Sequence, residues 1–216
     1  MWLGIDTTTE RLGLALVEAE SVLAAETAFV YRDMAAVLHP RLQDMLRRSG
    51  VRAAELSGIA VTCGPGSYTG MRLGLAAAQG LALVTGCPVA GVNAQAAIAR
   101  KCAQEGRPTV VVSRANAGDV YVAVFGPDGR VLHDTALVDM ATAAQLVPAG
   151  AVLTGNAAVL LDVAGVTPIE GDDLTHPDPV DVARIGMADY AAGTLRQASP
   201  MYLHPLAYRT SPGLKS

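Results

Sequence analysis

The sequence is poor in lysine, in aromatic residues and in cysteine, and each shortage excludes a class of protein. Lys101 and Lys215 are the only lysines among 216 residues, and the formal net charge is -4. Because binding to nucleic acid depends on clustered cations that neutralise phosphates, the chain is not expected to bind nucleic acid by itself. The three cysteines lack CxxC spacing, which excludes a disulfide framework and a cysteine zinc site and favours a cytoplasmic location. The longest apolar stretch, residues 73–84, falls short of the roughly 20 residues that span a bilayer, so no membrane association is expected.

Hydrophobic residues make up 51% of the chain and charged residues 17%, which excludes a disordered protein. Apolar patterns predict strands at residues 2–5, 12–17 and 21–30, a helix at 34–46, a strand at 58–62, a helix at 69–85, a strand at 88–92 and a helix at 94–105. The order then begins again, with strands at 109–113, 120–124 and 130–138, a helix at 141–147, a strand at 151–154 and helices at 157–163 and 179–195. A shift of 108 residues superimposes the two starts and places Leu12 on Val120. We therefore predict a duplicated α/β protein with lobes at residues 1–108 and 109–216; the second lobe ends in an irregular tail, and its last helix can pack back on the first lobe.

A glycine-rich turn joins the predicted strand at 58–62 to the helix that follows. Free amides and the helix dipole in such a turn favour an anion such as phosphate. The Walker, dinucleotide-binding and serine-hydrolase patterns would each need a glycine at position 69. The sequence has Thr69 there, so all three patterns are absent. The turn is therefore either part of a nucleotide or anion cleft or a structural turn with Ser67 or Thr69 as the helix N-cap. The residues of the possible cleft are Asp6, Thr7, Thr8, Gly64, Gly66, Ser67 and Thr69.

Asp6 ends the first predicted strand and precedes three threonines. A carboxylate in this place can hold Mg²⁺ and phosphate, or it can cap its own turn. The 108-residue shift aligns Arg114 with Asp6, and a cation there opposes a metal held between the two lobes. No two of the four histidines are three or four residues apart on a predicted helix. We therefore predict neither a metal site nor a catalytic residue.

Two predicted helices of the first lobe carry more apolar residues than one sheet face can cover. In the second of them Gly70, Gly74 and Ala78 recur every four residues. Small residues at this spacing allow either close packing on the helix's own sheet or the approach of a second polypeptide. An apolar surface left exposed by both helices would be typical of an interface. The expected interface residues are Met34, Leu38, Leu42, Met45, Gly70, Met71, Gly74 and Ala78.

Three segments together resemble the TsaB (YeaZ) family. They are residues 4–10 (GIDTTTE), residues 64–74 (GPGSYTGMRLG) with 79–82 (QGLA), and residues 200–203 (PMYL). The similarity is strong over the first hundred residues or so and weaker in the second half, where residues 118–121 (GDVY) carry it. The resemblance implies the actin-like ATPase (ASKHA) fold, with two duplicated ribonuclease-H-like lobes that each contain a mixed five-stranded sheet.

The resemblance implies a scaffold more than an enzyme. Such a subunit has no catalytic activity alone and belongs to the synthase complex that forms N6-threonylcarbamoyladenosine at position 37 of tRNAs reading codons that begin with A. It pairs with and activates the catalytic paralogue TsaD, and a TsaE-type ATPase joins the assembly. The complex binds tRNA, and this chain alone does not bind it strongly. The complex uses ATP and Mg²⁺, this chain holds no cofactor, and alone it is expected to form a homodimer. The alternative is an actin-like ATPase or phosphotransferase that acts through Asp6 and the turn at 64–70.

Two positions depart from the family pattern. Met34 stands where family members often have a histidine, although not the HxxxH pair with which the paralogue holds a metal. Arg114, Ala115 and Asn116 stand where the family often has Asp-Ala-Arg. No nucleotide-contact residue is therefore carried over from that turn.

Overall fold

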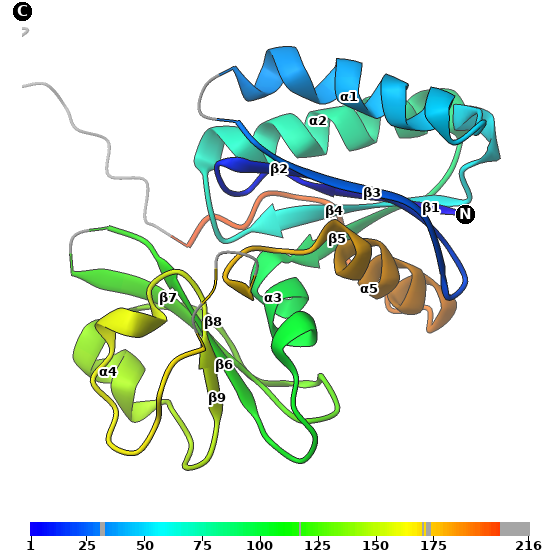
Figure 1. Ribbon diagram of the computed structural model, residues 1–216. Coiled ribbons are helices and arrows are strands. Elements are labelled where there is room, and N and C mark those ends of the chain that lie inside the picture. Colours follow the sequence, from blue (N-terminus) through cyan, green and yellow to red (C-terminus); the bar gives the residue numbers. More distant parts are fainter. Residues whose placement is uncertain (31–32, 117, 170, 172–173, 204–216) are drawn as a thin grey trace, which may run out of the picture.

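The computed structural model describes residues 1–30, 33–116, 118–169, 171 and 174–203, and it contains two α/β lobes (Figure 1). The first sheet has the strand order β3-β2-β1-β4-β5. Its strands are β1 (Trp2–Asp6), β2 (Arg11–Glu18), β3 (Ser21–Phe29), β4 (Gly58–Gly64) and β5 (Val89–Asn93). β1, β2 and β3 pair antiparallel, whereas β1, β4 and β5 pair parallel, so the predicted mixed five-stranded sheet is confirmed for the first lobe.

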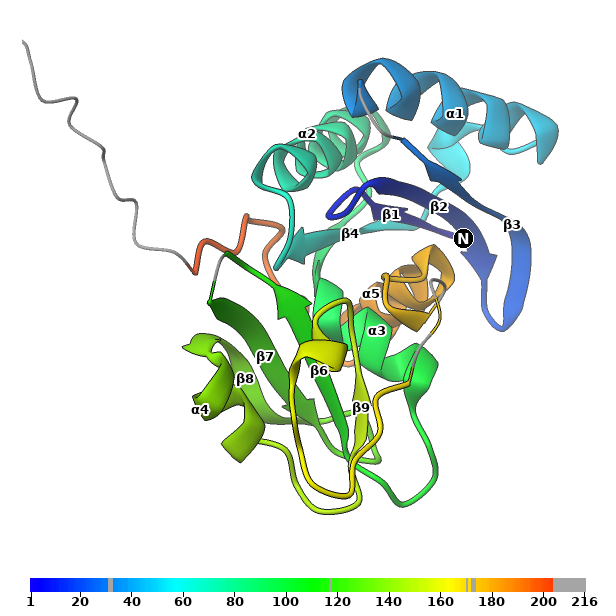
Figure 2. The ribbon, with the colours of Figure 1, turned by 60° about the vertical axis from the view of Figure 1, so that its left-hand side comes forward.

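Helices cover both faces of the first sheet (Figures 1 and 2). On one face lie α1 (Met34–Arg48) and α2 (Tyr68–Thr85), whose apolar residues meet the leucines of β1 and β2. On the other face lies α5 (Pro179–Ala191), which packs against Trp2 and Ala60. A short 3-10 turn, η1 (Ala53–Glu55), precedes β4. Burial on both faces explains why β1 and β4 are continuous apolar runs without alternation.

The second sheet has four strands in the described part of the chain, not the five expected. Its order is β8-β7-β6-β9, with β6 (Thr109–Arg114), β7 (Asp119–Phe125), β8 (Val131–Asp139) and β9 (Val152–Thr154). Beyond β9 only an isolated bridge between Leu153 and Pro168 stands beside this edge of the sheet. α4 (Met140–Gln145) covers one face, and α3 (Ala94–Cys102) covers the other. The helix predicted at 157–163 is wrong: only the 3-10 turn η2 (Ala158–Leu160) forms, in a segment whose β-branched valines and nearby glycine favour helix poorly.

The two lobes exchange one helix each (Figure 2). α3 comes from the first half of the sequence but packs on the second sheet, and α5 comes from the second half but packs on the first. Buried Gln95 of α3 donates hydrogen bonds to the carbonyl oxygens of Val111 and Tyr121, at 3.0 and 3.1 Å. Arg100 of α3 pairs with Asp181 of α5 at 3.0 Å. The two helices therefore join the lobes at the centre of the molecule.

Strand pairing gives the true correspondence between the lobes. Asp6 of β1 pairs with Gly13 of β2, and Ser113 of β6 pairs with Tyr121 of β7. Because Tyr121 follows Gly13 by 108 positions, the counterpart of Asp6 is Ser113, and the predicted match of Asp6 with Arg114 is wrong by one residue. A slip of one residue moves every side chain to the other face of a sheet. The apolar pattern did not reveal the slip because both first strands are buried on both faces.

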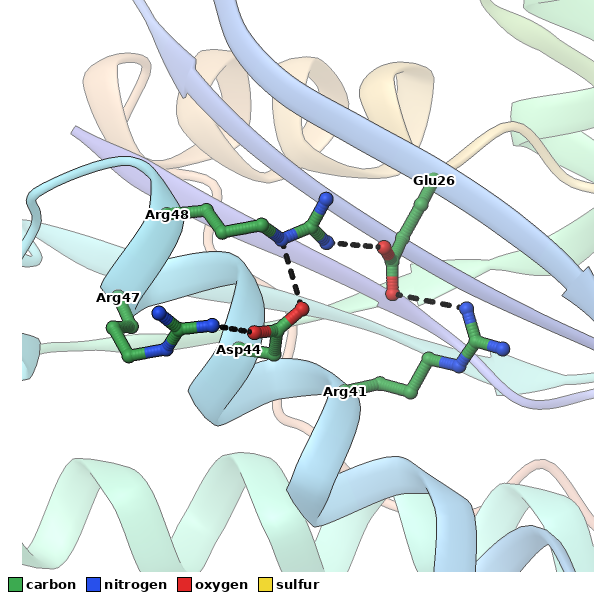
Figure 3. A network of polar contacts seen from close by, with 5 residues as sticks. All are labelled: Glu26, Arg41, Asp44, Arg47 and Arg48. Carbon is green, nitrogen blue, oxygen red and sulfur yellow. Dashed lines mark hydrogen bonds and ion pairs between the residues drawn. The ribbon is translucent and has the colours of Figure 1, made fainter.

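Ion pairs fasten α1 to the edge strand β3 (Figure 3). Glu26 of β3 lies 3.0 Å from Arg48 and 3.9 Å from Arg41, both on α1. Asp44 accepts from Arg48 at 2.8 Å and also pairs with Arg47. The arginine side chains are about half exposed or more, so each pair contributes roughly 1 kcal/mol or less. The two pairs of Glu26 tie α1 to β3, whereas the two pairs of Asp44 lie within α1.

Candidate functional site

A cleft of about 1040 Å³ lies between the two lobes. Its walls are the turn after β1, the glycine-rich turn with the first residues of α2, the end of β6 and the C-terminal residues 201–203. The structure brings five of the predicted cleft residues to this wall, and these are Thr7, Thr8, Gly66, Ser67 and Thr69. Asp6 and Gly64 do not line the cleft. The outline of a nucleotide cleft is therefore present, and its chemistry depends on what the lining atoms already bind.

Asp6 is buried and committed to its own turn. Its side chain is 1% exposed, and one carboxylate oxygen accepts hydrogen bonds from the Thr8 amide at 3.1 Å, the Thr8 hydroxyl at 2.6 Å and the Thr62 hydroxyl at 2.6 Å. Burial raises the pKa of Asp6, and the hydrogen bonds from Thr62 and Thr8 oppose that rise. Asp6 thus caps the β1–β2 turn and ties it to β4, which is the structural alternative for this residue.

The protein's own backbone occupies the glycine-rich turn. A Cβ atom at Gly66 would overlap the carbonyl oxygen of Thr8, and one at Gly70 would overlap the carbonyl oxygen of Thr7. The Ser67 amide donates to the Thr8 carbonyl at 2.7 Å, and the Ser67 hydroxyl accepts from the Gly70 amide at 3.1 Å as the N-cap of α2. Carbonyl oxygens carry partial negative charge and repel phosphate. The glycines therefore admit the β1–β2 turn, and these residues do not fit a Mg²⁺-nucleotide at this place.

In the described part of the second lobe, the position equivalent to Asp6 carries no carboxylate. Its equivalent position is Ser113, whose hydroxyl accepts a hydrogen bond from Gln95 at 3.2 Å. Arg114 also lines the cleft, and its amide donates to the Asn156 side chain at 2.8 Å. Across the residues that the structure describes, no group of three or more histidine, cysteine, aspartate or glutamate side chains is placed to hold a metal ion.

Most of the predicted partner interface is buried inside the first lobe. Leu38, Leu42 and Met45 belong to the core beneath α1 and α2. A Cβ atom at Gly74 would overlap the Thr7 hydroxyl, and Ala78 is 0% exposed. The residues of the expected interface that are buried in this way are Leu38, Leu42, Met45, Gly70, Met71, Gly74 and Ala78, while Met34 is partly exposed. The small residues of α2 serve close packing on its own sheet, so their assignment to a partner contact is corrected.

The outer side of α2 presents other apolar residues to solvent. Leu83 is 88% exposed and Val84 is 84% exposed, more than any other large hydrophobic residue in the described part of the chain. Ala76 and Gly80 are exposed, and Leu73 is partly exposed. We call these five residues the α2 surface. Residues 73, 76, 80 and 83 recur with the spacing of one helix face, and an apolar face of this kind is typical of an interface.

The interface residues predicted on α2 lie on the side of the helix that faces the sheet, not on the side that faces solvent. α2 is apolar nearly all round, so its periodicity does not distinguish the side that faces the sheet from the side that faces solvent. The exposure of the LV pair at 83–84 follows only from the placement of α2 on the sheet. Even so, among the residues that the structure describes, no helix combines the length and the apolar character needed to cross a membrane.

Arg72 lies on the exposed side of α2 between two tyrosines, a cluster that the sequence did not single out. Its guanidinium carbon lies 4.0 Å from the Tyr68 ring centre and 5.7 Å from that of Tyr202. Arg72 donates to the Tyr202 hydroxyl at 2.9 Å and also to the Tyr68 hydroxyl. The C-terminal segment that carries Tyr202 is held by a hydrogen bond from the Met201 amide to the Cys63 carbonyl at 2.8 Å.

Part of the chain is similar in sequence to a known protein family and to curated proteins. Residues 28–162 match the family model described as "TsaD: tRNA N6-adenosine threonylcarbamoyltransferase". The chain is 34% identical over 128 residues to the tRNA threonylcarbamoyladenosine biosynthesis protein TsaB of Escherichia coli (strain K12), covering 58% of this chain and 55% of that protein. It is 28% identical over 123 residues to the protein of the same name from Bacillus subtilis (strain 168), covering 57% and 54%. These matches span about half the length of the curated relatives.

The solved structure of YeaZ from Pseudomonas aeruginosa has the same fold. It superimposes with a TM-score of 0.80 over 94% of this chain and 99% of that one, at 23% sequence identity. At this identity the likeness concerns the fold alone.

Proposed function

Because this chain belongs to the TsaD-type tRNA N6-adenosine threonylcarbamoyltransferase family, in its TsaB (YeaZ) group, we propose that it is a non-catalytic subunit in the formation of N6-threonylcarbamoyladenosine in tRNA. It pairs with a TsaD-type paralogue and activates it, and a TsaE-type ATPase joins the complex. The product forms at position 37 of tRNAs that read codons beginning with A, and ATP and Mg²⁺ are used by the complex. Without the paralogue the chain pairs with a second copy of itself.

The observation that carries this proposal is the exposed α2 surface. Contact of Leu83 and Val84 with water is unfavourable, and none of the residues that the structure describes covers them. A partner that covers α2 and the neighbouring outer side of α1 would bury apolar area within an interface of about 1,600 Å² in total. Such a partner can be biased toward its active conformation if that conformation binds α2 more tightly than the inactive one. This is an activating role that needs no reacting group on this chain.

The alternative, an ATPase or phosphotransferase, has less support. Catalysis of phosphoryl transfer depends on Mg²⁺ and on donors that face the phosphates. Here the Asp6 carboxylate is buried under three hydrogen bonds, and the carbonyl groups of Thr7 and Thr8 fill the glycine-rich turn.

The test compares two double substitutions of neighbouring apolar residues. Leu83→Asp/Val84→Asp alters the α2 surface, and Val159→Asp/Leu160→Asp alters an exposed apolar pair of the second lobe, at 58% and 48% exposure. Binding of the TsaD-type paralogue from the same organism is measured by calorimetry, and tRNA modification is measured with purified components. We expect the α2 variant to lose about a hundredfold or more in affinity, because charge replaces apolar contact at the centre of the interface.

The control variant is expected to bind within about threefold of the unsubstituted protein. Both α2 residues are almost fully exposed, so the unfolding midpoint of the α2 variant should stay close to that of the parent. Unchanged binding and full modification activity in the α2 variant would refute this role of α2. Modification that continues when this chain is omitted would refute the proposed function.

A further inference from the structure

We propose that Arg72 is the electrostatic anchor of the α2 surface and binds the carboxylate of an aspartate or glutamate side chain on the docking paralogue. This inference rests on the proposed function and specifies the chemistry that the partner must present. The structure carries it through three observations, which are the isolation of the charge, its place on the helix and the way the tyrosines hold it.

Arg72 is a single charge on an apolar face. It is the only charged residue of α2, and residues 197–203, which run beside the helix, carry no charge at all. Among the described residues no carboxylate forms an ion pair with Arg72, although eight ion pairs involve arginine or lysine at other positions. The guanidinium therefore keeps its full positive charge toward solvent.

Arg72 also points to the side that a partner would cover. Residues 72, 76, 79 and 83 lie on successive turns of one side of α2, and all four are exposed. A polypeptide that covers Ala76 and Leu83 must therefore cover Arg72 as well. Removing water from an unpaired guanidinium is costly, and an interface that leaves it unpaired would lose most of the gain from the apolar contact. The partner must supply an anion at this position.

The tyrosines leave part of the guanidinium available and hold it still. Of its five N–H groups, one is donated to Tyr202 and one to Tyr68, so three remain for a ligand. Stacking on the Tyr68 ring at 4.0 Å restricts the side chain before binding. A planar fork with free N–H groups matches a carboxylate in two-point geometry, and an ordered side chain loses less entropy when it binds.

A carboxylate fits the surroundings better than the phosphates of tRNA. Recognition of a phosphate backbone depends on several cations that act together. This chain has a net charge of -4, and Arg72 has no basic neighbour on α2 or in residues 197–203. One arginine set among apolar residues is typical of the centre of a protein–protein interface.

The experiment measures the affinity of the full chain for the TsaD-type paralogue at 50 and at 500 mM NaCl. Arg72→Met keeps a long apolar side chain and removes the charge, whereas Arg72→Lys keeps the charge and removes the fork. We expect Arg72→Met to weaken binding roughly thirtyfold or more at low salt, and Arg72→Lys to recover part of that loss. High salt should weaken the parent complex but change the Arg72→Met complex less.

Two further variants separate the anchor from general damage. Arg130→Met removes an exposed arginine in the second lobe, 3.6 Å from Asp128, and should leave the affinity unchanged. Tyr68→Phe/Tyr202→Phe keeps the rings and the charge but removes both hydroxyl groups. Its affinity should stay within about tenfold of the parent, well above that of Arg72→Met, even if its melting temperature falls with the loss of the tether to the C-terminal segment.

The outcomes distinguish this inference from the function on which it rests. If the unsubstituted chain does not bind the paralogue, both fail. If it binds, and Leu83→Asp/Val84→Asp abolishes binding while Arg72→Met stays within threefold of the parent, only the anchor is overturned. If Arg72→Met weakens the binding of tRNA and leaves the affinity for the paralogue unchanged, the residue serves phosphate and the anchor is overturned as well.

Discussion

Two glycines of α2 should respond in opposite ways to the same substitution. Gly74 faces the sheet, where a Cβ atom would overlap the Thr7 hydroxyl and lie 3.3 Å from a methyl group of Val61. Gly80 faces solvent, and a Cβ atom there would meet nothing within 4 Å. Alanine at either position gains about 1 kcal/mol from helix propensity. The environments alone therefore decide the difference between Gly74→Ala and Gly80→Ala.

At Gly74 the added methyl group has a cost that exceeds this gain. Either the Thr7 side chain rotates and loses its 2.7 Å hydrogen bond to the Gly70 carbonyl, worth about 1 kcal/mol, or α2 moves away from β4. Overpacking of a buried helix–sheet contact costs about 1–3 kcal/mol. After the propensity gain of about 1 kcal/mol, Gly74→Ala should destabilise the protein by up to about 2 kcal/mol, whereas Gly80→Ala should stabilise it by about 1 kcal/mol.

The free energy of unfolding of each variant and of the parent is measured by urea unfolding, followed by far-ultraviolet circular dichroism. In thermal unfolding, the midpoints of the two variants should differ by roughly 2–4 °C for each kcal/mol of difference in that free energy. The measurements are made without the paralogue, because Gly80 belongs to the α2 surface. Equal stability of the two variants would refute the placement of Gly74 against the β1–β2 turn.

Two buried polar side chains give further predictions. Burial raises the pKa of Asp6 above 3.8, so its contribution to stability is greatest below that pH and declines as the pH rises through the raised pKa. Asp6→Asn removes this titration, and in urea unfolding from pH 4 to 8 its stability should rise relative to the parent; a constant difference would contradict the burial effect. Gln95→Leu leaves buried acceptors on Val111 and Tyr121 without their donor and should cost about 2 kcal/mol or more of unfolding free energy by the same assay, and a neutral result would contradict the hydrogen bonding of α3 to the second sheet.

The strands and most helices follow from the sequence because their signals are local. Alternating leucines predicted β2, the change of period predicted α1, and Ser67, one of the two N-cap candidates, is the N-cap of α2. The extent of the second sheet did not follow, since a strand exists only where a neighbour pairs with it. The role of Asp6 was also undecided, because its partner Thr62 lies 56 residues away in the sequence.

The candidate site depended still more on tertiary contacts. The sequence singled out the glycine-rich turn and the two apolar helices of the first lobe. In the structure the turn lines the cleft, and one of these helices, α2, carries the exposed apolar residues. Which side of α2 faces solvent depends on the rotation of the helix about its own axis, and a helix that is apolar nearly all round does not encode that rotation in its pattern. The Arg72 cluster was invisible because Tyr202 approaches it across 130 positions of chain.

The exchange of α3 and α5 makes the two halves of the polypeptide mutually obligate. A fragment that ended at residue 108 would keep the first sheet but lose the helix that shields Trp2 and Ala60, and its α3 would have no sheet to rest on. The complementary fragment would expose the valines that α3 shields, and its α5 would lack the first sheet against which it packs. The two halves of this chain therefore form one cooperative unit, whose packing is complete only when α5 has been synthesised.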